Sequence, residues 1–227
     1  MYERVRRLTP WSSVLMVAGV LVALAMPATP DSTASGAKVL AFYQHHHDAM
    51  YVAATALVVA ALAGILFFIT CATFLRRRGA DMLATACAVG AGIFGTGLLF
   101  ASGTLLAAND SPSRMSADMA RTLNLLQNDI WAPAMFGGIG IAVLCIGVST
   151  LRTRALPKAL AIIATVVGVA TLSGIGSWFA FMACGPLSLV VAGYVSARWE
   201  EPRQITLPDV PAARVAAHDG QAQQVKA

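Results

Sequence analysis

Residues 159–197 read ALAIIATVVGVATLSGIGSWFAFMACGPLSLVVAGYVSA, a run of 39 residues without Asp, Glu, Lys, Arg or His. A single helix of that length would extend about 58 Å, nearly twice the hydrocarbon thickness of a bilayer. Gly174 and Gly176 interrupt the run near its middle and favour a tight turn. We therefore expect two membrane-crossing helices here, near 156–174 and 178–197.

Four further stretches lack Asp, Glu, Lys and Arg, and each is long enough for one membrane helix: 8–30, 49–75, 82–109 and 130–151. The 227-residue chain is 57% hydrophobic and 12% charged, about half the charge that a soluble domain carries. This composition excludes soluble, fibrous and disordered classes. The sequence predicts an all-α, polytopic membrane helix bundle with six transmembrane helices. These are expected near 10–28, 50–75, 82–107, 130–151, 156–174 and 178–197.

The connections between the apolar stretches are alternately rich and poor in Lys and Arg, which is the pattern that orients membrane helices. With the N-terminus in the cytoplasm, 13 of the 16 Lys and Arg residues fall inside. The three outside are Lys38, Arg114 and Arg121. We therefore expect a plasma-membrane protein with both termini cytoplasmic. Because the basic residues flank apolar runs instead of forming a separate domain, no nucleic-acid partner is expected.

We expect a single domain over residues 1–200, because no connecting loop is long enough to bury a core of its own. Residues 201–227 contain Pro202, Pro208 and Pro211 and few large apolar side chains. This composition predicts a disordered cytoplasmic tail.

The first apolar segment has two interpretations. It could also be a cleaved signal peptide, which has the same features: a basic start, an apolar run, here over 14–26, and small residues near the cleavage site, here Ala23 and Ala25. The run is nevertheless long enough to span a membrane and ends naturally at Pro27. We favour a retained helix.

The two expected outer segments, 36–50 and 113–130, are patterned for short amphipathic helices. In the second, apolar residues recur at spacings of four and three, and Ser116 is placed to cap the start with Asp118 in the first turn. We expect both helices to cover the outer end of the bundle. The alternative is that they rest on lipid headgroups.

The expected spans lack ionisable residues at their centres, which argues against ion-coupled transport. Small residues recur every four positions and predict close helix packing, although the glycines of 90–97 would also suit a pore or pocket. The expected packing stripes are Ala56, Ala60 and Gly64; Ala84, Ala88, Gly92 and Thr96; and Ala134, Gly138 and Ala142. The four cysteines fall within spans, so neither a disulfide framework nor a thiolate metal site is expected.

One polar cluster is a candidate site, since both outer segments enter spans at the same expected depth. Imidazole and carboxylate groups suit zinc or copper, and His45 and Asp48, three residues apart, would share a helix face. The alternative is that these side chains are hydrated and cap helix ends. The candidate metal ligands are His45, His46, His47, Asp48 and Asp129, and the candidate ligand-binding residues are Asn124 and Asn128.

Three segments resemble a group of uncharacterised six-helix integral membrane proteins of high-GC Gram-positive bacteria: AFYQHHHD (41–48), LNLLQND (123–129) followed by Pro133, and ALPKALAIIATVVG (155–168). The resemblance covers roughly residues 5–200. It implies a plasma-membrane protein without an assigned activity, and it supplies no catalytic residues.

These patterns favour a non-catalytic membrane protein. It would be an accessory subunit, with another membrane protein or a second copy of itself as partner, or it would bind lipid or another apolar molecule. Two alternatives remain open. The first is a transporter or permeability factor for an apolar solute. The second is a metal-dependent membrane enzyme at the outer face, which would use the polar cluster.

Overall fold

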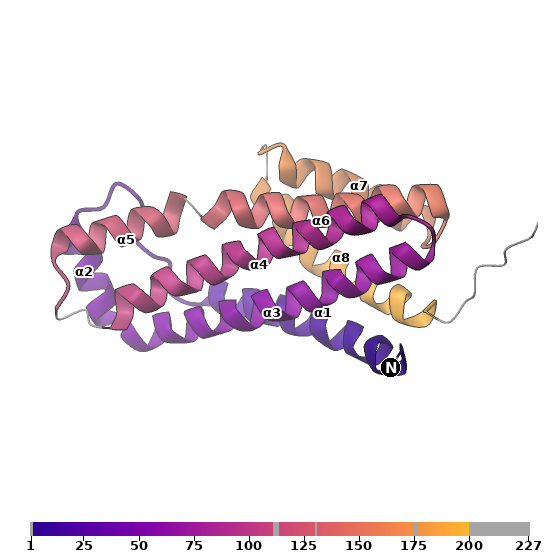
Figure 1. Ribbon diagram of the computed structural model, residues 1–227. Helices are drawn as coiled ribbons and strands as arrows, with labels where there is room; N and C mark the ends of the chain where they lie inside the picture. Colours follow the sequence, from indigo (N-terminus) through magenta and orange to yellow (C-terminus); the bar gives the residue numbers. More distant parts are fainter. Residues whose placement is uncertain (1, 111–113, 130, 175–176, 200–227) are drawn as a thin grey trace, which may run out of the picture.

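The computed structural model describes residues 2–110, 114–129, 131–174 and 177–199 (Figure 1). Every regular element in these ranges is an α-helix. This confirms the all-helical fold predicted from the sequence.

Five helices of the described chain are long and apolar enough to cross a membrane. They involve α1 (Tyr2–Ala25), α3 (His47–Arg77), α4 (Asp81–Asp110), α6 (Trp131–Thr153) and α8 (Ser177–Ala197). Each overlaps one of the charge-free stretches of the sequence, because the absence of charge is what makes a helix compatible with hydrocarbon.

The sixth apolar helix, α7 (Lys158–Leu172), is separate from α8 as expected, and Gly174 has the positive φ of 75° that a tight turn requires. However, α7 has only 15 residues. At 1.5 Å per residue it extends about 22 Å, less than a hydrocarbon core of roughly 30 Å. The described chain therefore has five long apolar helices and one short apolar helix.

The six apolar helices form a ring in which α1 packs on α3, α3 on α4, α4 on α6, α6 on α7, α7 on α8, and α8 back on α1. Phenylalanines fill much of its interior: Phe68 contacts both Phe67 and Phe94, with ring centroids 4.9 and 6.1 Å apart. Because α1 lies between α3 and α8, it is an integral part of this ring.

Two short helices, α2 (Gly36–His45) and α5 (Ala117–Asp129), pack on each other at one end of the bundle (Figure 1). Their side chains form a second apolar cluster with the adjoining ends of α3 and α4. The backbone nitrogen of Met119 donates to the Ser116 hydroxyl, so the predicted cap of α5 is confirmed. We call this end, comprising α2, α5 and the adjoining ends of α3 and α4, the cap.

The predicted outer helix over 36–50 is interrupted. His46 has φ −109° and ψ 26°, so α2 ends at His45 and α3 begins at His47. A chain that must enter the bundle from a helix lying across its end has to change direction, and His46 is where it does so.

Close helix packing is present, but one predicted stripe is wrong. A Cβ placed on Gly138 would lie 2.2 Å from the backbone nitrogen of Phe94, which shows how closely α6 approaches α4. Gly92 and Thr96 are instead exposed. On α4 the buried positions are spaced by three and four residues: Ala84, Cys87, Ala91, Phe94 and Leu98.

The start of α1, the α3–α4 and α6–α7 connections and the end of α8 lie at the end of the bundle opposite the cap (Figure 1). Most Lys and Arg residues of the described chain belong to these segments. Arg78 donates from Nη2 to the carbonyl oxygen of Arg198 at 3.0 Å, and the Arg77 guanidinium lies 4.9 Å from the ring centroid of Trp199. Trp199 in turn stacks on Phe74. These contacts fasten the end of α8 to the end of α3.

Candidate functional site

The two asparagines that were predicted to bind a ligand, Asn124 and Asn128, form hydrogen bonds to backbone carbonyls of this protein. Asn124 donates from Nδ2 to the carbonyl oxygens of Pro30 and Asp31, at 3.0 and 3.1 Å. Asn128 donates to the Pro30 carbonyl at 3.2 Å and to the Asn124 carbonyl at 2.8 Å. The amide nitrogens of both residues are therefore occupied in fixing the α1–α2 connection on α5.

The three histidines lie at the break between α2 and α3: His45 ends α2, His46 is at the break, and His47 begins α3. His47 contacts the neighbouring Asp48, with Nδ1 and Oδ1 3.2 Å apart, and both side chains are exposed. The rings of His45 and His46 lie edge to face, 4.8 Å apart. The helix is broken at His46, between His45 and Asp48, so the continuous helix on which their shared face was predicted is absent.

Within the described residues, no group of three or more His, Cys, Asp or Glu side chains is arranged to hold a metal ion. His45, His46, His47, Asp48 and Asp129 therefore do not converge on one point. Asp129 ends α5 as an exposed side chain. Zinc or copper binding at this end stays a prediction from residue type.

The cap contains buried polar contacts that the sequence analysis did not single out. Asn109 is 1% exposed and donates from Nδ2 to the carbonyl oxygen of His47 at 2.8 Å. Ser102 donates to the carbonyl oxygen of Ala54 at 2.9 Å. Gln127 is 7% exposed, and its Oε1 accepts a hydrogen bond from the Thr104 hydroxyl. These contacts join α3, α4 and α5 to one another.

An apolar cavity of about 340 Å³ lies among α1, α4, α6 and α8. Its 11 lining residues have apolar side chains or are glycine. On α8 the wall includes Gly185 and Pro186, and on α1 it includes Val17. A Cβ on Gly185 would meet only Val17, at 3.7 Å, so the glycine leaves this part of the cavity open.

A second cavity of about 190 Å³ continues toward the cap. Val20 and Phe181 line both cavities. Trp131, Trp178 and Gln127 line the second cavity alone. The first cavity is therefore wholly apolar, whereas the second ends among tryptophans and one buried amide.

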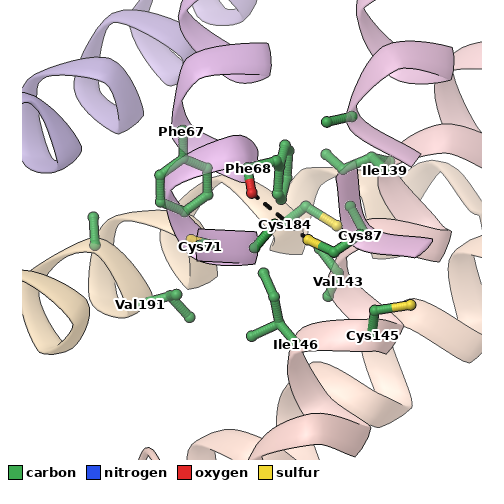
Figure 2. Packing of buried hydrophobic residues seen from close by; sticks show 14 of the residues in the cluster. Phe67, Phe68, Cys71, Cys87, Ile139, Val143, Cys145, Ile146, Cys184 and Val191 are labelled. Carbon is green, nitrogen blue, oxygen red and sulfur yellow. Dashed lines mark hydrogen bonds between the residues drawn. The ribbon is translucent and has the colours of Figure 1, made fainter. Parts of the chain in front are cut away.

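The four cysteines come from four helices and belong to the apolar cluster of the bundle as free thiols (Figure 2). Cys87 donates its thiol hydrogen to the carbonyl oxygen of Phe68, 3.8 Å away. Around them lie aliphatic and aromatic side chains, including Ile139, Val143 and Ile146. Such surroundings suit cysteine as a small apolar residue.

The sequence did contain one signal for the first cavity. Gly185 and Pro186 stand together inside an otherwise apolar helix, where a missing side chain and a missing N–H both depart from ordinary packing. The partners of that wall on α1 and α4 are distant in sequence, so only the fold brings the cavity together.

No family model, curated protein or solved structure matches this chain.

Proposed function

We propose that this protein is a multi-pass plasma-membrane protein that binds an apolar molecule in the cavity among α1, α4, α6 and α8. We propose in addition that the chain crosses the membrane six times and that both termini lie in the cytoplasm. The binding is non-catalytic, and the protein serves as a carrier or accessory of the molecule that it holds.

The membrane location is supported by the outer surface of the helices. Large apolar side chains project outward on every apolar helix, including Leu66 at 58%, Val166 at 61% and Phe179 at 80% exposure. A soluble protein seldom presents so continuous an apolar surface. The orientation is supported by the basic residues at the end opposite the cap, because cytoplasmic ends are enriched in Lys and Arg.

The cavity is the observation that carries the binding proposal. The cavity is partly open to the outside of the bundle, because Leu21, Pro186 and Leu189 in its wall are exposed, so an apolar molecule can reach it from the side. An apolar occupant restores the missing dispersion contacts without needing a charged partner. Because the side chains that line the cavity are aliphatic or aromatic, the cavity favours apolar molecules.

Filling the cavity tests the proposal. In Gly185→Phe the new ring would project into the space beside Val17 and compete with an occupant for it. Gly193→Phe is the matched control, since Gly193 lies two helical turns along α8 and a Cβ there meets nothing within 4 Å. The measurement is native mass spectrometry of the purified protein with its co-purified small molecules.

We expect a bound apolar molecule on the wild type and on Gly193→Phe, and none on Gly185→Phe. Equal occupancy of all three proteins would overturn the binding proposal. The orientation is tested separately by an impermeant thiol reagent on intact cells. Lys38→Cys should be labelled and Ala197→Cys should be protected.

A further inference from the structure

We infer that the two cavities form one site for an acyl chain, whose carbonyl oxygen accepts a hydrogen bond from the side-chain amide of Gln127. This inference rests on the proposed function and specifies the class of molecule that is bound. It assigns the tail to the apolar cavity and the oxygen-bearing end to the cavity near the cap.

The two cavities adjoin along α1. Val20 and Phe181 contribute to the walls of both, so the two spaces lie against the same two side chains. The wall that α1 and its end provide runs from Met16 to Met26, one residue past the helix. At 1.5 Å per residue this is about 15 Å, which is half of a roughly 30 Å hydrocarbon core and so the length of chain in one leaflet.

Gln127 supplies the polar end. Its side chain is more than nine-tenths buried, and the Thr104 hydroxyl meets its Oε1. The described residues offer no hydrogen-bond acceptor to its amide nitrogen, Nε2, although Gln127 lines the cavity. A ligand oxygen in the cavity would supply an acceptor for this amide nitrogen.

The neighbours of Gln127 fix the direction of the bound chain. Trp131 and Trp178 line the same cavity, and tryptophan is enriched where hydrocarbon meets the headgroup region. The wall formed by Gly185 and Pro186 lies in the wholly apolar cavity, beyond Phe181. The carbonyl end of the occupant therefore faces the interface, and its tail points toward the interior of the bundle.

The residues that line the cavities also restrict which polar group the bound molecule can have. In the part of the chain that the structure describes, neither cavity has an Arg, Lys or His side chain in its wall to balance a phosphate. A carbonyl oxygen needs only a neutral donor, which Gln127 provides. Free fatty acids and fatty acyl esters share this chemistry.

The test uses dibromostearic acid, its methyl ester, dibromostearoyl phosphatidylcholine and a bromoalkane of similar length. Bromine quenches tryptophan fluorescence on contact, and Trp131 and Trp178 report from the cavity wall. Each probe is titrated against the detergent-solubilised wild type, Gln127→Met and Gln127→Glu. Gln44→Met is the control, because Gln44 is exposed on α2.

We expect Gln127→Met and Gln127→Glu to bind the acyl probes about three- to tenfold more weakly than the wild type does, as the loss of one hydrogen bond predicts. Their affinity for the bromoalkane should be unchanged, as should every affinity of Gln44→Met. Among the acyl probes, a preference for the acid identifies free fatty acids as the source. Binding of the esters or of the phospholipid identifies esterified chains.

Equal affinities of the wild type and both Gln127 variants for the acyl probes would overturn this inference. If Gly185→Phe still abolished binding of all probes, the apolar-binding function would stand without it. If Gly185→Phe bound every probe as the wild type does, the proposed function itself would fail.

Discussion

The side-chain amide of Asn124 lies 3.0 Å from the carbonyl oxygen of Pro30, a residue 94 positions earlier in the chain. This contact fixes the connection that leaves α1 onto the face of α5. The same connection contributes Pro27, Ala28 and Thr29 to the wall of the cavity near the cap. Asn124 thus holds the connection that forms part of the cavity wall, although Asn124 does not line the cavity itself.

Removing this contact should loosen the cap. In Asn124→Ala the carbonyls of Pro30 and Asp31 lose a donor, and we expect the free energy of unfolding to fall by about 1–3 kcal/mol. Hydrogen exchange of residues 29–35 should accelerate. Asp129→Asn, an exposed change at the end of the same helix, is the control and should shift stability by less than about 0.5 kcal/mol. Unchanged exchange in Asn124→Ala would contradict the prediction.

Adding a methyl group at Gly138 should separate α4 from α6. Its Cβ would meet the Phe94 backbone at 2.2 Å, and backbone atoms cannot move aside as a side-chain end can. We expect Gly138→Ala to destabilise the bundle by about 1–3 kcal/mol in thermal unfolding in detergent. Gly137→Ala is the neighbouring control, because a Cβ there meets nothing within 4 Å. Similar melting temperatures for both variants would refute this packing.

Alkaline pH should weaken the cap through Tyr43. Burial raises the pKa of Tyr43 to about 12 from its ordinary value of 10. Between these values the unfolded chain loses the phenolic proton before the folded protein does, so stability is intact below about pH 10 and falls as pH rises toward 12. Tyr43→Phe should abolish this component of the loss, whereas Tyr51→Phe, on an exposed part of α3, should retain it.

The check is chemical denaturation at a series of alkaline pH values, with ultraviolet absorbance of tyrosinate as a second signal. If Tyr43→Phe and the wild type lose stability in parallel above pH 10, the buried phenol is not responsible.

Trp199 should be the main attachment of the end of α8. It is 5% exposed and stacks on Phe74 under the Arg77 guanidinium. We expect Trp199→Ala to cost about 3–5 kcal/mol, as large aromatic truncations do. Trp11→Ala is the control, since Trp11 is 68% exposed. Thermal unfolding of the two variants should differ clearly, and equal effects would show that the stack contributes little.

The helices could be predicted from the sequence because charge decides which segments tolerate hydrocarbon, and charge is a local property. The stripe containing Gly92 and Thr96 failed for a geometric reason. Residues four apart rotate by about 40° around a helix at each step, so Thr96 lies about 120° from Ala84. The buried face of α4 follows alternating steps of three and four, from Ala84 through Ala91 to Leu98.

The candidate site was less predictable because its geometry depends on contacts between distant segments. Shared depth at the outer interface suggested that His45, Asp48 and Asp129 converge. The break at His46 interrupts the helix that was expected to carry both His45 and Asp48, and the two asparagines are engaged by the α1–α2 connection. Gln127 appeared in the same segment of sequence, but only packing against α1, α3 and α8 shows that its amide reaches a cavity.

The unequal lengths of the helices bear on the bilayer around the protein. At about 46 Å, α3 exceeds the hydrocarbon thickness, and its surplus is accommodated in the cap. The short α7 has no such surplus, yet Ile163, Val166 and Val169 on its outer face are among the most exposed aliphatic side chains. In the proposed arrangement with six membrane crossings, lipid against α7 would compress to meet it, at a cost of a fraction of a kcal/mol for each ångström of mismatch. Thinner bilayers relieve that compression, so membrane thickness becomes a variable to which this side of the protein responds.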